Sequence, residues 1–181
     1  MLRALAVLLL ALVALVGCAD RAVTPPSAGA PPVPAPDAVF LSGMIPHHQQ
    51  ALDLAAVVAE RDASAGLEAI ALRIDREQVE EVGQMRGLMR ARGLEPVPVP
   101  MMAGMASPET LATLRTLRGP AFERLWLDTM IRHHEGALVM AQDYLATGTD
   151  ETLRRFGRVL LDGQAQEIAL MQGLRTDVAG S

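Results

Sequence analysis

Thiol chemistry is almost absent from this chain, which contains a single cysteine, Cys18. One cysteine excludes an internal disulfide, because that bond joins two cysteines whose Cα atoms lie within about 7 Å. If Cys18 is modified, no thiol remains, and a soft ligand atom can then come only from methionine. The chain contains ten methionines.

Lysine is absent and aromatic side chains are scarce. All sixteen basic residues are arginine, 21 residues are acidic, and aromatics make up 3% of the chain. Nucleic-acid-binding domains carry basic patches, and many of them stack bases on aromatic side chains. An acidic chain with so few aromatics is therefore not expected to bind nucleic acid.

The N-terminus has the character of a targeting segment. Residues 1–17 contain Arg3, an apolar run and then small residues, which is the layout of a secretory signal peptide. The run ends in "LVGC" (15–18), which resembles the lipobox of bacterial lipoproteins, and this resemblance implies a lipid on Cys18 and attachment to a membrane. The alternative is an ordinary signal peptide with a chance cysteine.

The next segment, residues 18–36, is rich in proline and alanine and shows no helical period. Such a composition predicts a disordered tether. The folded domain is then expected to comprise residues 37–181. That length suffices for one domain with its own core.

Histidine is equally scarce, but its placement is ordered. All four histidines lie in two pairs, within "MIPHHQQAL" (44–52) and "MIRHHEGAL" (130–138). A shift of 86 residues aligns these segments, and it also aligns "QVEEVGQM" (78–85) with "QAQEIALM" (164–171). Two copies of one supersecondary unit are the simplest interpretation.

Each unit predicts two helices joined by a turn, since apolar residues recur at steps of three and four. The expected helices run from Asp37, as N-cap, to about 59 and from 67 to 92 in the first unit (37–92), and over about 121–146 and 150–175 in the second unit (121–176). The crossover between the units, 93–120, contains helix-breaking prolines and then Ser107-Pro108, which predicts a short helix to about 118. The expected fold is all-α: a ferritin-like four-helix bundle built from two repeated αα-hairpins, with a short helix in the crossover.

In an antiparallel hairpin, residues equally far from the turn lie at the same height. This relation places His47 and His48 level with Gln78 and Glu81. Residues three or four positions apart share a helix face, so one methionine from each helix joins the cluster. The candidate metal ligands are Met44, His47, His48, Gln78, Glu81 and Met85 in the first unit, and Met130, His133, His134, Gln164, Glu167 and Met171 in the second.

Imidazole and thioether together indicate a soft or borderline ion. Neutral histidine is the commonest protein metal ligand, and methionine favours Cu(I). Copper, as Cu(I) or Cu(II), is thus the expected ion, with zinc as the alternative. A further soft-metal site could use Met101, Met102 and Met105 of the "MMAGM" segment. The residues also fit a purely structural interpretation, in which histidine and glutamate form a buried hydrogen-bond network and methionines fill the core.

The two units are not fully symmetric, and the charge beside the second histidine pair makes the first unit the better candidate for a metal site. Arg132 lies beside the second histidine pair, where a fixed positive charge disfavours a bound cation. Glu135, in place of Gln49, offsets part of that charge. The position that matches Arg132 is Pro46, which removes a backbone donor and is expected to kink the first helix.

These motifs resemble a known bacterial family. "FLSGMIPHHQQAL" (40–52) and "FERLWLDTMIRHHEGALVMA" (122–141), each followed by Q-x-x-E-[VI]-x-x-M-x-x-L, are similar to the domain of unknown function 305 (DUF305) over about 37–175. The resemblance implies a ferritin-like helical bundle of a kind that is often secreted or lipid-anchored. It also implies copper binding, as in some members, and a metal role for ten of the candidate residues: His47, His48, Gln78, Glu81, Met85, His133, His134, Gln164, Glu167 and Met171.

The sequence favours a binding protein over an enzyme. Di-iron carboxylate bundles use glutamate from two helices and Glu-x-x-His from the other two, whereas these helices carry His-His and Gln-x-x-Glu. No Ser-His-Asp or Cys-His set is recognisable either. We expect an extracytoplasmic lipoprotein, anchored to the bacterial cell membrane, that binds copper for sequestration or handover. The alternative is a helical interaction module without metal, and homo-oligomers or a metal-handling partner stay open.

Overall fold

The computed structural model describes residues 35–99 and 102–180, and every regular element in these ranges is a helix. The elements are α1 (Pro36–Ala56), the 3₁₀ helix η1 (Val58–Glu60), α2 (Ala65–Ala91), α3 (Pro108–Thr116), α4 (Gly119–Thr147) and α5 (Glu151–Gly180). The predicted all-α fold class is confirmed. The predicted signal peptide, Cys18 and nearly all of the predicted tether lie outside the described residues.

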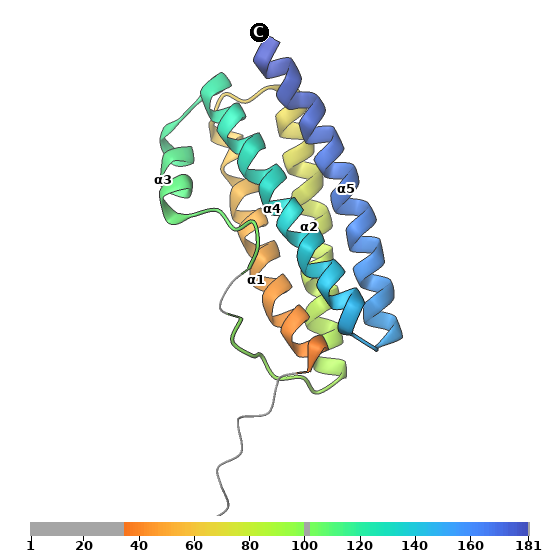
Figure 1. The fold of residues 1–181 in the computed structure, drawn as a ribbon. Coiled ribbons are helices and arrows are strands. Elements are labelled where there is room, and N and C mark those ends of the chain that lie inside the picture. The colour runs from red at the N-terminus through yellow and green to blue at the C-terminus, as the bar shows by residue number, and fades with distance from the viewer. Residues whose placement is uncertain (1–34, 100–101, 181) are drawn as a thin grey trace, which may run out of the picture. The chain divides into compact units, whose positions relative to one another are not determined.

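The four long helices form a bundle of two hairpins (Figure 1). α1 packs closely against α2, α4 packs closely against α5, and α1 and α4 form the main contact between the hairpins. The crossover runs along the outside of the bundle past α1 and carries α3. This is the predicted four-helix bundle of two αα-hairpins with a short crossover helix.

The start of α1 shows that one predicted cap is wrong. Ala35, rather than Asp37, is the N-cap, and Pro36 occupies the first helical position, where its missing N–H costs nothing. The carboxylate of Asp37 instead accepts a hydrogen bond from the Tyr144 hydroxyl at 2.8 Å, which joins the start of α1 to the end of α4. α1 continues through Pro46, which is exposed.

The turn of the first hairpin contains a cap that the sequence analysis did not identify. Ser64 is the N-cap of α2, and its hydroxyl accepts a hydrogen bond from the Leu67 N–H at 3.4 Å. The N–H and the hydroxyl of Ser64 both donate to the buried carboxylate of Glu123 in α4, at 2.6 and 3.0 Å. These two hydrogen bonds satisfy the buried carboxylate and hold the turn against the second hairpin.

The core consists of two hydrophobic clusters on either side of a polar layer. One cluster contains Trp126, whose indole N–H donates to the Leu54 carbonyl at 2.8 Å, together with Met130 and Met171. The other contains Met44 and Met85 among aliphatic and aromatic side chains. Along each long helix, the buried histidines, glutamines and glutamate of the motifs lie between residues of the two clusters. The polar layer is therefore flanked on both sides by buried methionines.

The crossover is fixed to the bundle beside that layer. Gly104 (φ 77°) lies against Gly136 of α4, and a Cβ on either glycine would collide with the backbone of the other segment. Gln50 of α1 accepts a hydrogen bond from the Ala106 N–H at 2.7 Å and donates one to the Ala106 carbonyl at 3.1 Å. The backbone of residues 103–106 is thus held close to both central helices.

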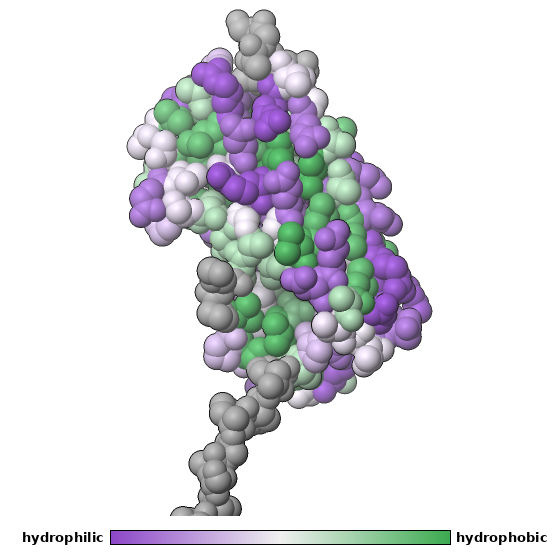
Figure 2. All heavy atoms as spheres, viewed as in Figure 1, coloured by the Kyte–Doolittle hydropathy of each residue, from purple (hydrophilic) through white to green (hydrophobic). Residues whose placement is uncertain are grey.

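On the face formed by α4 and α5, hydrophilic and hydrophobic side chains are intermixed (Figure 2). Some large apolar side chains are exposed, among them Val139 of α4 and Val159 and Leu170 of α5. None of the helices in the described ranges combines the length and the apolar character needed to cross a membrane.

Candidate metal centre

The four histidines occupy the polar layer and are completely buried. His47 and His48 come from α1, and His133 and His134 come from α4. Consecutive side chains on an α-helix point about 100° apart, since one turn takes 3.6 residues. The two members of a pair therefore cannot face the same partner, and the structure separates them into outer and inner histidines.

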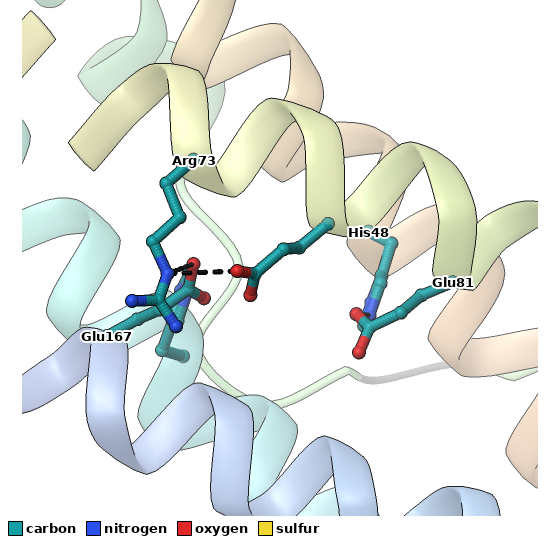
Figure 3. Close-up of polar contacts among 6 residues, drawn as sticks. His48, Arg73, Glu81 and Glu167 are labelled. Atoms are coloured by element: carbon teal, nitrogen blue, oxygen red, sulfur yellow. Dashed lines mark hydrogen bonds and ion pairs between the residues drawn. The ribbon is translucent and has the colours of Figure 1, made fainter. Parts of the chain in front are cut away.

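The outer histidines, His48 and His134, face glutamates within their own hairpins. The Nε2 atom of His48 lies 2.9 Å from Glu81 Oε2, and that of His134 lies 2.9 Å from Glu167 Oε2. Figure 3 shows the His48 and Glu81 side chains turned toward each other. The predicted register of both hairpins is confirmed by these two contacts.

The inner histidines, His47 and His133, face each other across the contact between α1 and α4. Their ring centroids lie 3.8 Å apart, with an angle of 36° between the ring planes. Sequence analysis missed this pairing because it placed both members of each pair opposite the same hairpin partner. The signal was available in the doubled motif, since the second histidine of a pair needs a different neighbour from the first.

Burial keeps both inner imidazoles neutral. Desolvation lowers the pKa of His47 to about 4, against an opposing hydrogen bond to the Ala103 carbonyl. Desolvation also holds the pKa of His133 well below its usual range, and the charge of a protonated His47 would lower it further. Neutral imidazole is the form that binds metal ions.

The hydrogen bonds of the histidines leave ring nitrogens without partners. His47 Nε2 lies 2.9 Å from the Ala103 carbonyl, which can only accept, so Nε2 carries the proton of the neutral ring and Nδ1 keeps a lone pair. The Nδ1 atoms of His47, His48 and His134 have no hydrogen-bond partner, and His133 has none at either nitrogen. A completely buried imidazole with two unpaired nitrogens is exceptional in a folded core.

The glutamines of the layer are also incompletely paired. Gln78 and Gln164 are buried, and neither amide atom of Gln78 has a hydrogen-bond partner, nor has Oε1 of Gln164. Each buried polar group without a partner costs about 1–3 kcal/mol. The layer therefore concentrates unpaired donors and acceptors in the middle of an otherwise well-packed bundle.

The predicted thioethers flank this layer. Met44 and Met85 lie on one side of it and Met130 and Met171 on the other, and all four side chains are 0% exposed. The loop methionines of the further soft-metal prediction are not part of the layer: Met102 and Met105 are half-buried in the crossover, and Met101 lies outside the described residues.

The histidine and carboxylate side chains alone do not form a metal centre in this layer. In the described ranges, no three side chains drawn from histidine, cysteine, aspartate and glutamate are grouped so that they could hold one metal ion. A site with three or more protein ligands in this layer would have to include a thioether or an amide. A donor set of imidazole and thioether suits a soft monovalent ion better than zinc or iron.

The two glutamates differ in their surroundings. Arg73 of α2 reaches across to α5, where its Nε lies 3.7 Å from Glu167 Oε1, and it also lies 3.0 Å from Glu77 Oε1 (Figure 3). Within the described part of the chain, Glu81 pairs with no arginine. The charge that was predicted to disfavour metal, Arg132, is exposed, and so is Glu135. Solvent therefore screens Arg132, and the cation that distinguishes the two units is Arg73.

The fold and the layer define a class of helical protein: a bundle of two αα-hairpins that encloses two facing histidine pairs between methionines. The chain belongs to the DUF305 family, whose model, described as a domain of unknown function, matches residues 37–175. None of the curated proteins compared with the chain is significantly similar to it.

Solved structures, among them two of this family, resemble the chain over most of its length. A DUF305 protein of Streptomyces coelicolor that is classed as secreted is 30% identical, with a TM-score of 0.76 over 80% of this chain and 94% of that chain. A DUF305 fragment from Deinococcus radiodurans is 34% identical, with a TM-score of 0.73 over 81% and 99%. CopM in its Cu(I)-bound form is 28% identical, with a TM-score of 0.65 over 78% and 96%, and CopM has also been solved with Ag and with Cu(II).

Proposed function

We propose that this protein is an extracytoplasmic lipoprotein that binds copper as Cu(I) in its histidine layer, for sequestration or handover. The inner histidines supply nitrogen ligands, and the flanking methionines supply thioethers. Glu81 and Glu167 accept hydrogen bonds from the Nε2 protons of the outer imidazoles, which leaves the Nδ1 lone pairs available to bind metal. Carboxylates orient metal-bound histidines in the same way. No catalytic step is part of this proposal.

The observation that carries the proposal is His133. This imidazole is neutral and completely buried, and neither of its ring nitrogens makes a hydrogen bond of normal geometry. The backbone of His47 lies close enough to oppose part of the lowering of the His133 pKa, but burial outweighs it. In a bundle selected only for stability, an apolar side chain of similar volume would avoid the desolvation cost at this position. A metal cation bound to the ring nitrogens would offset this desolvation cost.

Similarity supports the choice of ion and compartment. CopM, which shares the fold at 28% identity, was solved with Cu(I) and with Ag, both soft monovalent ions. The signal-like residues 1–17 and the relative classed as secreted support a place outside the cytoplasm. Attachment through a lipid on Cys18 rests on the "LVGC" motif alone.

A structural hydrogen-bond network is the second candidate. The two His–Glu contacts at 2.9 Å favour it, because each ties the two helices of one hairpin together. Under this alternative, His133 stabilises the fold. Under the metal proposal, it reduces the stability of the metal-free fold.

The substitution His133→Leu separates these candidates, because leucine fills similar volume without polar atoms. We expect it to abolish tight Cu(I) binding, measured anaerobically by chelator competition and elemental analysis on residues 35–181. We also expect the metal-free variant to unfold in urea with unchanged or higher free energy. Exposed Gln49→Leu is the matched control and should change neither quantity. Retained copper with a loss of stability would establish the structural network instead.

A further inference from the structure

The two hairpins offer unequal access to the histidine layer from the seam between α2 and α5. The side chain of Glu81 is 21% exposed, whereas that of Glu167 is 3% exposed. Arg73 stands over Glu167 (Figure 3). The same guanidinium also pairs with Glu77, so it lies between the two carboxylates on that side. Glu81 contacts His48 and pairs with no arginine among the described residues.

The antiparallel register of α2 and α5 identifies the residue opposite Glu81. Gly66 of α2 packs against Leu174 of α5, and Arg73, seven residues further along α2, pairs with Glu167, seven residues back along α5. Eight further steps in each helix bring Glu81 level with Val159. A surface recess agrees with this register: it is lined on α2 by Gln84, Gly87 and Leu88, and on α5 by Thr152, Arg155, Phe156 and Val159. Arg155 is exposed, and it forms no ion pair with Glu81.

Val159 is also the residue that corresponds to Arg73 in the internal repeat, since the two are separated by the same 86 positions as the histidine pairs. In one unit, an arginine crosses the seam and covers the glutamate behind the outer histidine. In the other unit, a short apolar side chain, 63% exposed, occupies the same position. The repeat is thus asymmetric at the seam position from which Arg73 reaches the glutamate of the opposite hairpin.

We propose that the metal ion of the proposed function enters the bundle through the seam between α2 and α5 at Glu81, and that Arg73 closes the equivalent route at Glu167. A carboxylate that is partly exposed and carries no arginine attracts a soft monovalent cation such as Cu(I). Glu81 touches His48, so an ion that reaches the carboxylate has arrived at the outer histidine. On the Arg73 side, a fixed positive charge and full burial of Glu167 oppose the same approach.

The test is the rate of metal uptake rather than the amount bound. Ag(I) serves as a redox-stable probe for Cu(I), and the single tryptophan, Trp126, reports it by fluorescence because it shares a core cluster with Met130 and Met171. Stopped-flow mixing uses the full chain in detergent with Cys18→Ser, which removes the one thiol. Val159→Arg is compared with Val139→Arg, an exposed valine of α4 away from the seam.

We expect Val159→Arg to slow uptake by about tenfold at low salt, with a smaller effect at high ionic strength, and Val139→Arg to leave the rate unchanged. Arg73→Val should raise the rate up to about twofold, since a second route of the same kind opens, while Arg158→Val, an exposed arginine of α5, should not. Equilibrium stoichiometry should be equal in all variants. Equal rates for both valine variants with normal stoichiometry would overturn the entry route and leave the proposed function intact. A wild-type chain that binds no Ag(I) would overturn both.

Discussion

The two hairpins share one motif and one His–Glu geometry, yet they differ wherever a third element touches them. Both Nε2–Oε2 distances are 2.9 Å. In the second hairpin, Glu167 is buried and covered by Arg73, and His133 is unpaired. In the first hairpin, Glu81 is partly exposed, and His47 is bound to the carbonyl of Ala103 in the crossover. The repeated sequence therefore determines the His–Glu geometry within each hairpin. Contacts between the hairpins and with the crossover determine the exposure, ion pairs and hydrogen bonds of these residues.

Removal of the two glutamates should give the largest difference between the hairpins. Glu167→Ala leaves buried His134 without its hydrogen-bond partner and removes the buried carboxylate that forms an ion pair with Arg73. We expect it to lower the free energy of unfolding by about 4 kcal/mol. Glu81→Ala, at a partly exposed site without arginine, should cost about 1 kcal/mol. Urea unfolding of the metal-free protein measures both, and equal losses would contradict the environmental difference.

The crossover contacts both hairpins at matching positions of the repeat, Gln50 and Gly136. In the first hairpin, Gln50 holds Ala106 with two hydrogen bonds, and in the second, the bare Gly136 lets the loop backbone approach. Gly136→Ala should therefore cost about 3 kcal/mol, because the methyl group displaces backbone rather than a flexible side chain. Gln50→Ala should cost about 1–2 kcal/mol. Chemical denaturation tests the order, and a tolerated Gly136→Ala would show that the loop is not docked as described.

Acid should destabilise the metal-free protein through its inner histidines. His47 has its pKa lowered to about 4 in the folded state, so below pH 6.5 the unfolded chain binds a proton that the folded chain excludes. Stability is then complete above about pH 6.5 and falls toward pH 4, by about 2 kcal/mol between pH 6.5 and 5 for one such group. Denaturant titrations across this range in the presence of a chelator measure the slope. His133→Leu should reduce it, and a slope of zero in the wild type would contradict the burial of neutral imidazoles.

The smallest expected change in stability concerns two positions at which the hairpins are equivalent. Gly87 and Gly173 occupy matching positions of the repeat inside α2 and α5, and a Cβ at either would meet no atom within 4 Å. Replacement of each by alanine should raise the free energy of unfolding by about 0.5–1 kcal/mol, since alanine loses less entropy in a helix. Thermal melts of the two variants should coincide, and a loss at either position would reveal a contact on that helix face.

The sequence predicted the fold because helical period and internal repeat act within each hairpin. The same local geometry placed His48 opposite Glu81 and His134 opposite Glu167. It did not predict the close approach of His47 to His133, which depends on how α1 and α4 lie against each other. It also missed the hydrogen bond of His47 to Ala103 and those of Ser64 to Glu123. These contacts join segments that are far apart in the sequence, and helical period gives no information on which such segments meet. The metal role of the layer remains a proposal that the geometry supports.

The complete burial of the four flanking methionines has a consequence for oxidative damage. Peroxides convert accessible thioethers to sulfoxides, which are polar and no longer fit a packed interior. Met44, Met85, Met130 and Met171 are shielded from solvent, whereas Met102 and Met105 are half-buried in the crossover. An oxidant should therefore consume the loop sulfurs first and reach the interior ones only when the helices transiently separate. The crossover methionines would then act as a sacrificial supply that delays the loss of the deeper donors.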